Sequence, residues 1–262
     1  MTVPHSHKHP SLAWIGALAL LAVAASVTPA ATQADLPVPF APGESLTYDI
    51  SWTTFVTAGQ ATLSVRERRA VGAGRAQYYL MAEGQPSSML QKLYHLYYKA
   101  ESMLDTRTLR PALATVYSDE NGRTRYKVST FRGNGLIDYE IRTSSTSKSQ
   151  VKVPATAQDP LGAIYVLRAI PLKAGQAPFT IPVTDSGKSY TMRVAVGARE
   201  TVRTGVGPID ALKLNLAITA PDPADNSTLT LWISDDARRL PVKFQAALAV
   251  GSFQLTLAKV AG

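Results

Sequence analysis

Apolar and polar side chains alternate one by one in segment after segment of this 262-residue chain. The apolar members of three such segments are Leu46-Tyr48-Ile50, Leu212-Leu214-Leu216 and Val242-Phe244-Ala246. Successive side chains of a β-strand point to opposite faces, so this pattern predicts strands with one buried and one wet face. Such strands are typical of antiparallel sheets.

Turn sequences separate these segments at hairpin spacing. Asn121-Gly122 is the clearest, because the favoured two-residue hairpin turn needs residues that tolerate positive φ. Asp185-Ser186-Gly187 is another. We predict about a dozen strands, too many for one flat sheet. The expected fold is therefore mainly β, with a single curved antiparallel sheet or a partly closed β-barrel.

Two short helices are expected to interrupt the strands. Asp159-Pro160 has the form of an N-cap followed by proline in the first turn, and Pro171 should end that helix. A second helix is predicted from about Pro86 to Tyr94, where Met89, Leu90 and Leu93 are apolar.

The N-terminal segment has the features of a signal peptide. Lys8 precedes an apolar run from Leu12 to Val27, which is too short to span a bilayer, and small residues follow. We predict a signal peptide at residues 1–34, cleaved after Ala30 or Ala34, although an uncleaved anchor is the alternative. Residues 35–262 would then form a single all-β domain, without a transmembrane segment, in the periplasm of a Gram-negative cell.

The residues left after such cleavage exclude several kinds of chemistry. The chain contains no cysteine, so neither disulfides nor a lipid-modified N-terminal cysteine can form. Only His95 remains of four histidines, which argues against the usual zinc and copper sites. No Gly-x-Ser-x-Gly elbow supports a catalytic triad with His95. We expect no cofactor, no metal ion and no enzymatic activity.

Carboxylates provide the remaining catalytic or metal-binding candidates. Asp235-Asp236, and more weakly Glu101 with Asp105, could act as an acid–base pair in glycoside hydrolysis. For Asp235-Asp236 a tight turn with Asp–Arg pairing is the favoured alternative. A calcium site built from Asp222, Asp225 and Asn226 lacks the longer ligand pattern and the terminal glutamate, so a solvated turn is favoured there.

One aromatic and basic segment is the best candidate for ligand binding. Tyrosines beside lysines suit a membrane interface, a glycan-stacking surface or the mouth of a hydrophobic cleft. The candidate residues are Lys92, Leu93, Tyr94, Leu96, Tyr97, Tyr98 and Lys99. The favoured alternative is that the tyrosines belong to the core.

Net charge favours anionic partners. The chain carries +8, and removing the predicted signal peptide takes away only Lys8, which leaves +7. A lipid or another anionic amphiphile would be attracted, as would an envelope protein, whereas nucleic acid is not expected outside the cytoplasm. The basic residues are dispersed, so the charge could also serve solubility alone.

Several segments together resemble a known family over nearly all of the predicted mature chain. They are residues 40–48, Ala58-Gly59, residues 159–168, residues 232–242 and residues 251–253. This set is similar to the exported bacterial family called domain of unknown function 3108. The resemblance implies a curved antiparallel sheet around a few short helices, and no particular activity. Such a shape is similar to that of periplasmic lipoprotein carriers, which hold acyl chains in a concave apolar face.

Three functions follow as hypotheses. The first is a non-enzymatic periplasmic protein that binds an apolar or amphiphilic ligand, such as a lipid or acyl chain, in its curved sheet. The second is an envelope interaction or assembly protein with a filled core. The third, less favoured, is a carboxylate-based hydrolase that acts on an envelope polymer.

Overall fold

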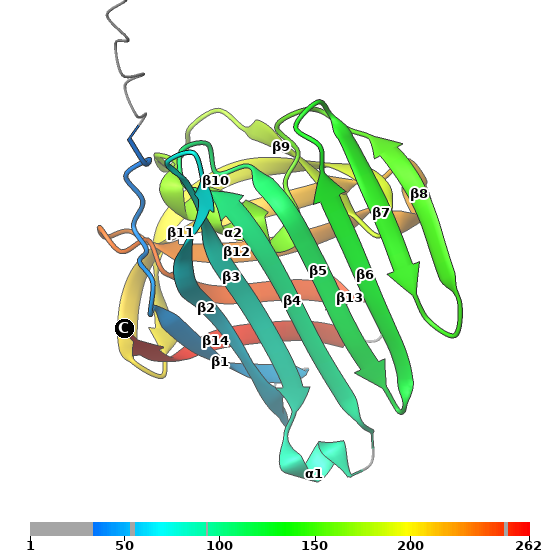
Figure 1. The fold of residues 1–262 in the computed structure, drawn as a ribbon. Helices are drawn as coiled ribbons and strands as arrows, with labels where there is room; N and C mark the ends of the chain where they lie inside the picture. Colours follow the sequence, from blue (N-terminus) through cyan, green and yellow to red (C-terminus); the bar gives the residue numbers. More distant parts are fainter. Residues whose placement is uncertain (1–33, 53–55, 93, 249–250) are drawn as a thin grey trace, which may run out of the picture. The chain divides into compact units, whose positions relative to one another are not determined.

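The computed structural model describes residues 34–52, 56–92, 94–248 and 251–262, and residues 1–33 of the predicted signal peptide lie outside them. In these residues, fourteen strands form one antiparallel sheet (Figure 1). The strands are β1 (Ser45–Trp52), β2 (Val56–Gly72), β3 (Arg75–Pro86), β4 (Leu96–Asp105), β5 (Pro111–Glu120), β6 (Arg123–Phe131), β7 (Leu136–Arg142), β8 (Thr146–Lys152), β9 (Phe179–Asp185), β10 (Lys188–Thr204), β11 (Gly207–Thr219), β12 (Ser227–Ser234), β13 (Pro241–Leu248) and β14 (Gly251–Ala261). The helices are α1 (Ser88–Gln91), α2 (Pro160–Ala169) and the short 3₁₀ helix η1 (Pro223–Asp225).

Almost every strand pairs with its neighbours in the sequence. The order across the sheet is β8-β7-β6-β5-β4-β3-β2-β1-β14-β13-β12-β11-β10-β9, so β1 with β14 is the one pairing between sequence-distant strands in this part of the chain. The sheet is strongly curved but not closed, because β8 and β9 form its two edges. The mainly β fold with a curved antiparallel sheet is therefore confirmed.

The two ends of the sheet nevertheless approach each other. Lys127 of β6 donates from Nζ to Oγ of Ser186, in the turn between β9 and β10, at 2.6 Å. Gln158 forms an isolated parallel bridge with Val183 of β9. Figure 1 shows α2 between the layer made by β2–β8 and the layer made by β9–β14, and α2 contacts β3, β4 and β9.

The predicted hairpin turns form where the residues allow positive φ. Asn121 and Gly122 have φ of 50° and 79°, and Ser186 and Gly187 have φ of 51° and 73°. Positive φ at both central residues is the signature of the type I′ turn, whose twist matches that of the flanking strands. The first pair joins β5 to β6 and the second joins β9 to β10.

Both predicted helices exist, but one is shorter than expected. The α2 helix begins after Asp159, whose Oδ1 accepts hydrogen bonds from the backbone nitrogens of Leu161 and Gly162 at 3.0 Å. The α1 helix covers only Ser88–Gln91, so the predicted start at Pro86 and the predicted end at Tyr94 are both wrong. The chain leaves the helix early because β4, which pairs with β3, already begins at Leu96. Pro86 is the last residue of β3 and pairs with Gly59, and this strand pairing delays the helix.

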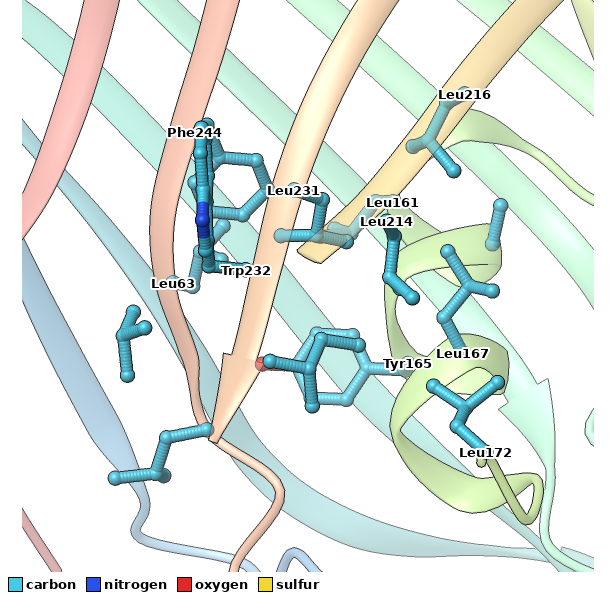
Figure 2. Packing of buried hydrophobic residues seen from close by; sticks show 14 of the residues in the cluster. Leu63, Leu161, Tyr165, Leu167, Leu172, Leu214, Leu216, Leu231, Trp232 and Phe244 are labelled. Carbon is cyan, nitrogen blue, oxygen red and sulfur yellow. The ribbon is translucent and has the colours of Figure 1, made fainter. Parts of the chain in front are cut away.

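The α2 helix fills one part of the space inside the curved sheet. Leu161, Tyr165 and Leu167 are at most 5% exposed. Figure 2 shows them packed together with side chains of the sheet, among them Leu214 and Leu231. This packing places the main hydrophobic core between the helix and the concave face.

Arg168 holds α2 in place through a buried network. Arg168 is 1% exposed, and its guanidinium forms a two-pronged ion pair with Glu44, at 2.6 and 2.8 Å. It also donates to the backbone carbonyls of Arg238 and Arg239, at 3.2 and 3.1 Å. Its charge lies 5.2 Å from the ring centre of Phe40, a favourable cation–π distance. The helix is thereby tied to the start of β1 and to the β12–β13 turn.

Asp159 predicts an unusual dependence of stability on pH. Burial raises the pKa of its carboxyl, and the hydrogen bonds from Ser102 and the helix amides offset part of that shift. A raised folded pKa means that the folded state binds more protons, so stability falls as pH rises through the interval between the unfolded and folded pKa values. Asp159→Asn keeps a side-chain oxygen that can cap the helix, and it removes the titrating carboxyl that causes this fall in stability. We therefore expect its unfolding free energy, relative to the wild type, to increase as pH rises above about 4, the unfolded pKa of an aspartate.

Urea unfolding at several pH values measures this difference. Asp138→Asn provides a control of opposite sign, because hydrogen bonds from Gln150 and Arg132 lower the pKa of Asp138. That variant should lose stability relative to the wild type as pH rises toward about 4, because the stabilising effect of a lowered pKa develops below the unfolded pKa. A pH-independent difference for Asp159→Asn would contradict the prediction.

Candidate functional site

Two apolar cavities lie on the concave side of the sheet. One, which we name the α1 cavity, has a volume of about 550 Å³ and is lined by residues of β1–β4, β14 and α1. The other, the α2 cavity, has a volume of about 510 Å³ and is lined by α2 and by residues from β9 to β13. Phe244 lines the α2 cavity and its cross-strand partner Leu255 lines the α1 cavity, so the two cavities are neighbours on one surface.

Small residues at inward positions create the α1 cavity. Ala61 of β2 lies opposite Gly84 of β3, and Ala82 of β3 lies opposite Leu63 of β2. Farther along β3, inward positions carry Leu80, which is fully buried, and Tyr78. The same strand therefore fills the interior at one end and leaves it empty at the other.

The wall of the α1 cavity is almost entirely apolar. Leu90 of α1, Phe253 and Leu255 of β14, and Ile50 of β1 complete it. A water molecule beside such a wall finds few polar partners. The α1 cavity is thus suited to hydrocarbon rather than to a polar ligand.

The residues of the predicted binding segment separate in the structure. Tyr94, Leu96 and Tyr98 line the α1 cavity. Lys92 is the C-cap of α1 and is exposed, while Leu93 lies outside the described residues.

Tyr97 and Lys99 alternate with the cavity-lining residues of β4. Tyr97 donates its hydroxyl to Glu83 at 2.7 Å, and Lys99 forms an ion pair with Glu101 at 2.8 Å. The hydrogen bond with Glu101 raises the pKa of Lys99. The structure therefore brings three of the seven predicted residues, Tyr94, Leu96 and Tyr98, together at the cavity. The binding role of all seven stays a prediction.

The α2 cavity has an apolar floor and a polar rim. Ala163 and Leu167 of α2 face Met192, Leu216 and other apolar side chains of the sheet. Asp185, Ser186, Lys188, Tyr190 and Asp225 supply polar groups along its lining, and Lys188 pairs with Asp225 at 2.5 Å. Sequence reasoning identified Asp185-Ser186-Gly187 only as a turn, because nothing in the local pattern shows what a turn faces.

The carboxylate pairs considered for catalysis have structural partners. Asp236 accepts from Ser234 Oγ at 2.7 Å and from the backbone nitrogens of Arg238 and Arg239, which closes the β12–β13 turn. Asp235 lies 3.5 Å from Arg199. This is the turn with Asp–Arg pairing that was favoured for Asp235-Asp236.

Glu101 and Asp105 are also engaged separately. Glu101 accepts from Thr115 at 2.8 Å, whereas Asp105 accepts from the backbone nitrogens of Arg107 and Thr108 at 3.0 Å and so caps a turn. His95 is exposed, with its Nε2 3.5 Å from Asp119.

The residues considered for calcium are used in local structure. Asp222 caps η1 through the backbone nitrogen of Ala224, and Asn226 accepts from the backbone nitrogen of Ala220 at 2.8 Å. Among the described residues, no group of three or more His, Cys, Asp or Glu side chains could hold a metal ion. Within the same ranges, no helix has the length and hydrophobicity needed to cross a bilayer.

The fold is similar to solved structures of bacterial proteins. A β-barrel-like protein of domain of unknown function DUF1849 from Brucella abortus matches 84% of this chain and 97% of its own, with a TM-score of 0.55 and 11% identity. A Parabacteroides distasonis protein, provisionally described as a lipoprotein, covers 87% of this chain and 100% of its own at a TM-score of 0.38 and 10% identity. A Bacteroides fragilis protein with a YmcC-like fold is provisionally described as exported. It covers 87% of this chain and 99% of its own, with a TM-score of 0.35 and 12% identity.

At these identities the Brucella protein shows a shared fold and nothing more. A search of curated proteins finds no match. The sequence model of DUF3108, described as a protein of unknown function, matches residues 47–258, which confirms the resemblance drawn from the sequence. The chain is therefore a member of the DUF3108 family.

Proposed function

We propose that this protein is a non-enzymatic binding protein that holds the apolar chain of an amphiphile, such as an acyl chain, in the α1 cavity. The observation that carries the proposal is a cavity of about 550 Å³ with an almost wholly apolar wall. Its volume lies within the range of about 300–1,000 Å³ that is typical of small-molecule sites. A protein whose core is filled, as in the docking hypothesis, would have no such space.

Packing energetics supports an occupant for this cavity. Protein interiors are packed as densely as organic crystals, and side chains that line a void lose dispersion contacts. Dispersion contacts are missing at three neighbouring inward positions that carry small residues, Ala61, Ala82 and Gly84. A bound hydrocarbon chain would restore them and would bury the apolar wall.

The predicted signal peptide gives the proposal its cellular setting. Cleavage at Ala30 or Ala34 would release the domain into the periplasm, where lipids and other amphiphiles in transit between membranes are exposed to water. Tyr94 and Tyr98 would lie at the mouth of the cavity, each with an apolar ring and a polar hydroxyl.

Filling the cavity tests the proposal. Ala82→Phe places an aromatic ring opposite Leu63, inside the α1 cavity. We expect the purified wild-type protein to bind dansyl-labelled undecanoic acid with enhanced, blue-shifted fluorescence. Ala82→Phe should weaken that binding by about tenfold or more, which corresponds to about 1.4 kcal/mol.

A matched control adds the same ring elsewhere on β3. Gln77 lies on the opposite face of the strand from Tyr78, so Gln77→Phe should leave binding unchanged. Circular dichroism establishes that both variants fold, and Ala61→Leu provides a milder second filling. The proposal fails if the wild type does not bind the probe, or if both filled variants bind it as the wild type does.

A further inference from the structure

The charged residues in the lining of the α2 cavity are Asp185, Lys188 and Asp225. Asp185, at the end of β9, lines the α2 cavity and also a hollow of about 30 Å³ between the two ends of the sheet. That hollow is large enough for a water molecule or a small headgroup substituent. Asp185 therefore lies where an apolar space meets a small polar one.

Three tyrosines surround this position. Tyr98 of β4 and Tyr139 of β7 line the hollow, and Tyr190 of β10 lines the α2 cavity beside Asp185. Burial and then the charge of Asp185 raise the pKa of all three hydroxyls, that of Tyr98 to about 12. The phenols therefore stay neutral, and their hydroxyl groups lie within electrostatic range of one carboxylate.

The two neighbouring lysines form their hydrogen bonds with groups other than Asp185. Lys127 donates to Ser186 Oγ at 2.6 Å, and Lys188 pairs with Asp225 at 2.5 Å. Asp185 itself accepts from Ser186 Oγ at 3.1 Å. None of the salt bridges of the described residues includes Asp185, so this carboxylate has no direct ion pair in this part of the chain.

A carboxylate next to aromatic rings at the edge of an apolar cavity has the chemistry that recognises organic ammonium groups. The carboxylate supplies charge, and the ring faces attract cations that are too bulky or too apolar to be strongly hydrated. The other two carboxylates of the hollow already have partners. Asp159 accepts from Ser102 Oγ at 2.6 Å and caps α2, and Glu101 pairs with Lys99 at 2.8 Å.

We propose that the α2 cavity binds an amphiphile with an ammonium-bearing headgroup, the ammonium lying on the α2-cavity side of Asp185, beside Tyr190. The hydrocarbon part would pack against Ala163 and Leu167 of α2. This proposal rests on the proposed function, because it assumes that the concave face accepts amphiphiles. It opposes the preference for anionic partners that net charge predicts, since the local charge at this rim is negative.

Amphiphiles with one tail and different headgroups provide the test. Isothermal titration calorimetry on the purified protein would use decyltrimethylammonium, decylphosphocholine, decyl maltoside and decyl sulfate, each below its micelle concentration. We expect the two ammonium compounds to bind about tenfold more tightly than the maltoside. A preference for decyltrimethylammonium alone would indicate a cationic ligand, and an equal preference for the phosphocholine would indicate a zwitterionic lipid headgroup.

Two variants and a control locate the recognition. Asp185→Asn should abolish the preference for ammonium and leave maltoside binding unchanged, while Tyr190→Leu should reduce the preference. Asp225→Asn removes the rim carboxylate that is paired with Lys188 and should keep the preference.

The outcomes separate this inference from the proposed function. If no decyl compound binds and the dansyl probe does not bind either, the proposed function fails and this inference fails with it. If the decyl compounds bind without regard to headgroup, if decyl sulfate binds best, or if Asp185→Asn retains the preference, the inference is overturned while the proposed function stands.

Discussion

Replacing Arg168 with alanine is expected to lower the free energy of unfolding by about 3–5 kcal/mol, the range measured when one partner of a buried ion pair is removed. Glu44, whose side chain is 13% exposed, would keep a charge without its partner. The carbonyl oxygens of Arg238 and Arg239 would lose their donor as well. Denaturation in urea, followed by circular dichroism, measures the change, and the absence of cysteine removes disulfide exchange as a complication.

An exposed ion pair from the same turn provides the control. Arg238 pairs with Asp236 at 3.1 Å, with side chains 61% and 42% exposed, so Arg238→Ala should cost less than about 1 kcal/mol. The double variant Glu44→Gln with Arg168→Met should recover part of the loss, because it leaves no buried charge. A loss below about 1 kcal/mol for Arg168→Ala would mean that the pair does not hold α2 to the sheet.

Replacing Gly59 with alanine is expected to lower the free energy of unfolding by about 1–3 kcal/mol, the usual cost of overpacking. A Cβ atom at Gly59 would lie 2.2 Å from the carbonyl oxygen of Gln85 and 2.8 Å from Cα of Pro86. Both are backbone atoms and cannot rotate away, so β2 and β3 would have to separate next to α1. Urea unfolding gives the loss of stability, and weaker binding of the dansyl probe would report distortion of the α1 cavity.

Gly84, on the other strand of the same hairpin, is the matched control. A Cβ atom there would meet nothing closer than 3.9 Å, which is ordinary contact. Gly84→Ala should therefore be neutral or stabilising by up to about 1 kcal/mol, since alanine restricts the unfolded chain more than glycine does. If both variants lost the same amount of unfolding free energy, the destabilisation would come from the general loss of backbone freedom and not from the close approach at Gly59.

Local patterns predicted the strands and the longer helix well. Alternation placed Leu212, Leu214 and Leu216 on one face, and all three are at most 3% exposed in the folded sheet. Asp159-Pro160 marked the start of α2 because capping depends on only a few neighbouring residues. Where strand pairing competes with helix formation, as at Pro86, the same local reasoning misplaced the boundary of α1.

The cavities and their charges depend on residues far apart in the sequence. In the sequence, Ala82 has the pattern of an ordinary inward-facing strand residue. Whether a void forms beside it depends on the side chains of β2 and β14, which are distant in the sequence. The partner of Arg168 is 124 residues away. The predicted binding segment lies on a strand, so alternation directed Tyr98 to the cavity and Lys99 to Glu101.

The pairing of β1 with β14 determines the order in which this protein can fold. Every other pairing joins consecutive strands and can form soon after the second strand is synthesised. Strand β1 is made first, yet one of its edges waits for the last strand, and until then β1 and β13 both expose unpaired backbone groups. Two separate meanders would accumulate during synthesis, and a chaperone that shields strand edges would act on this interval until β14 joins them.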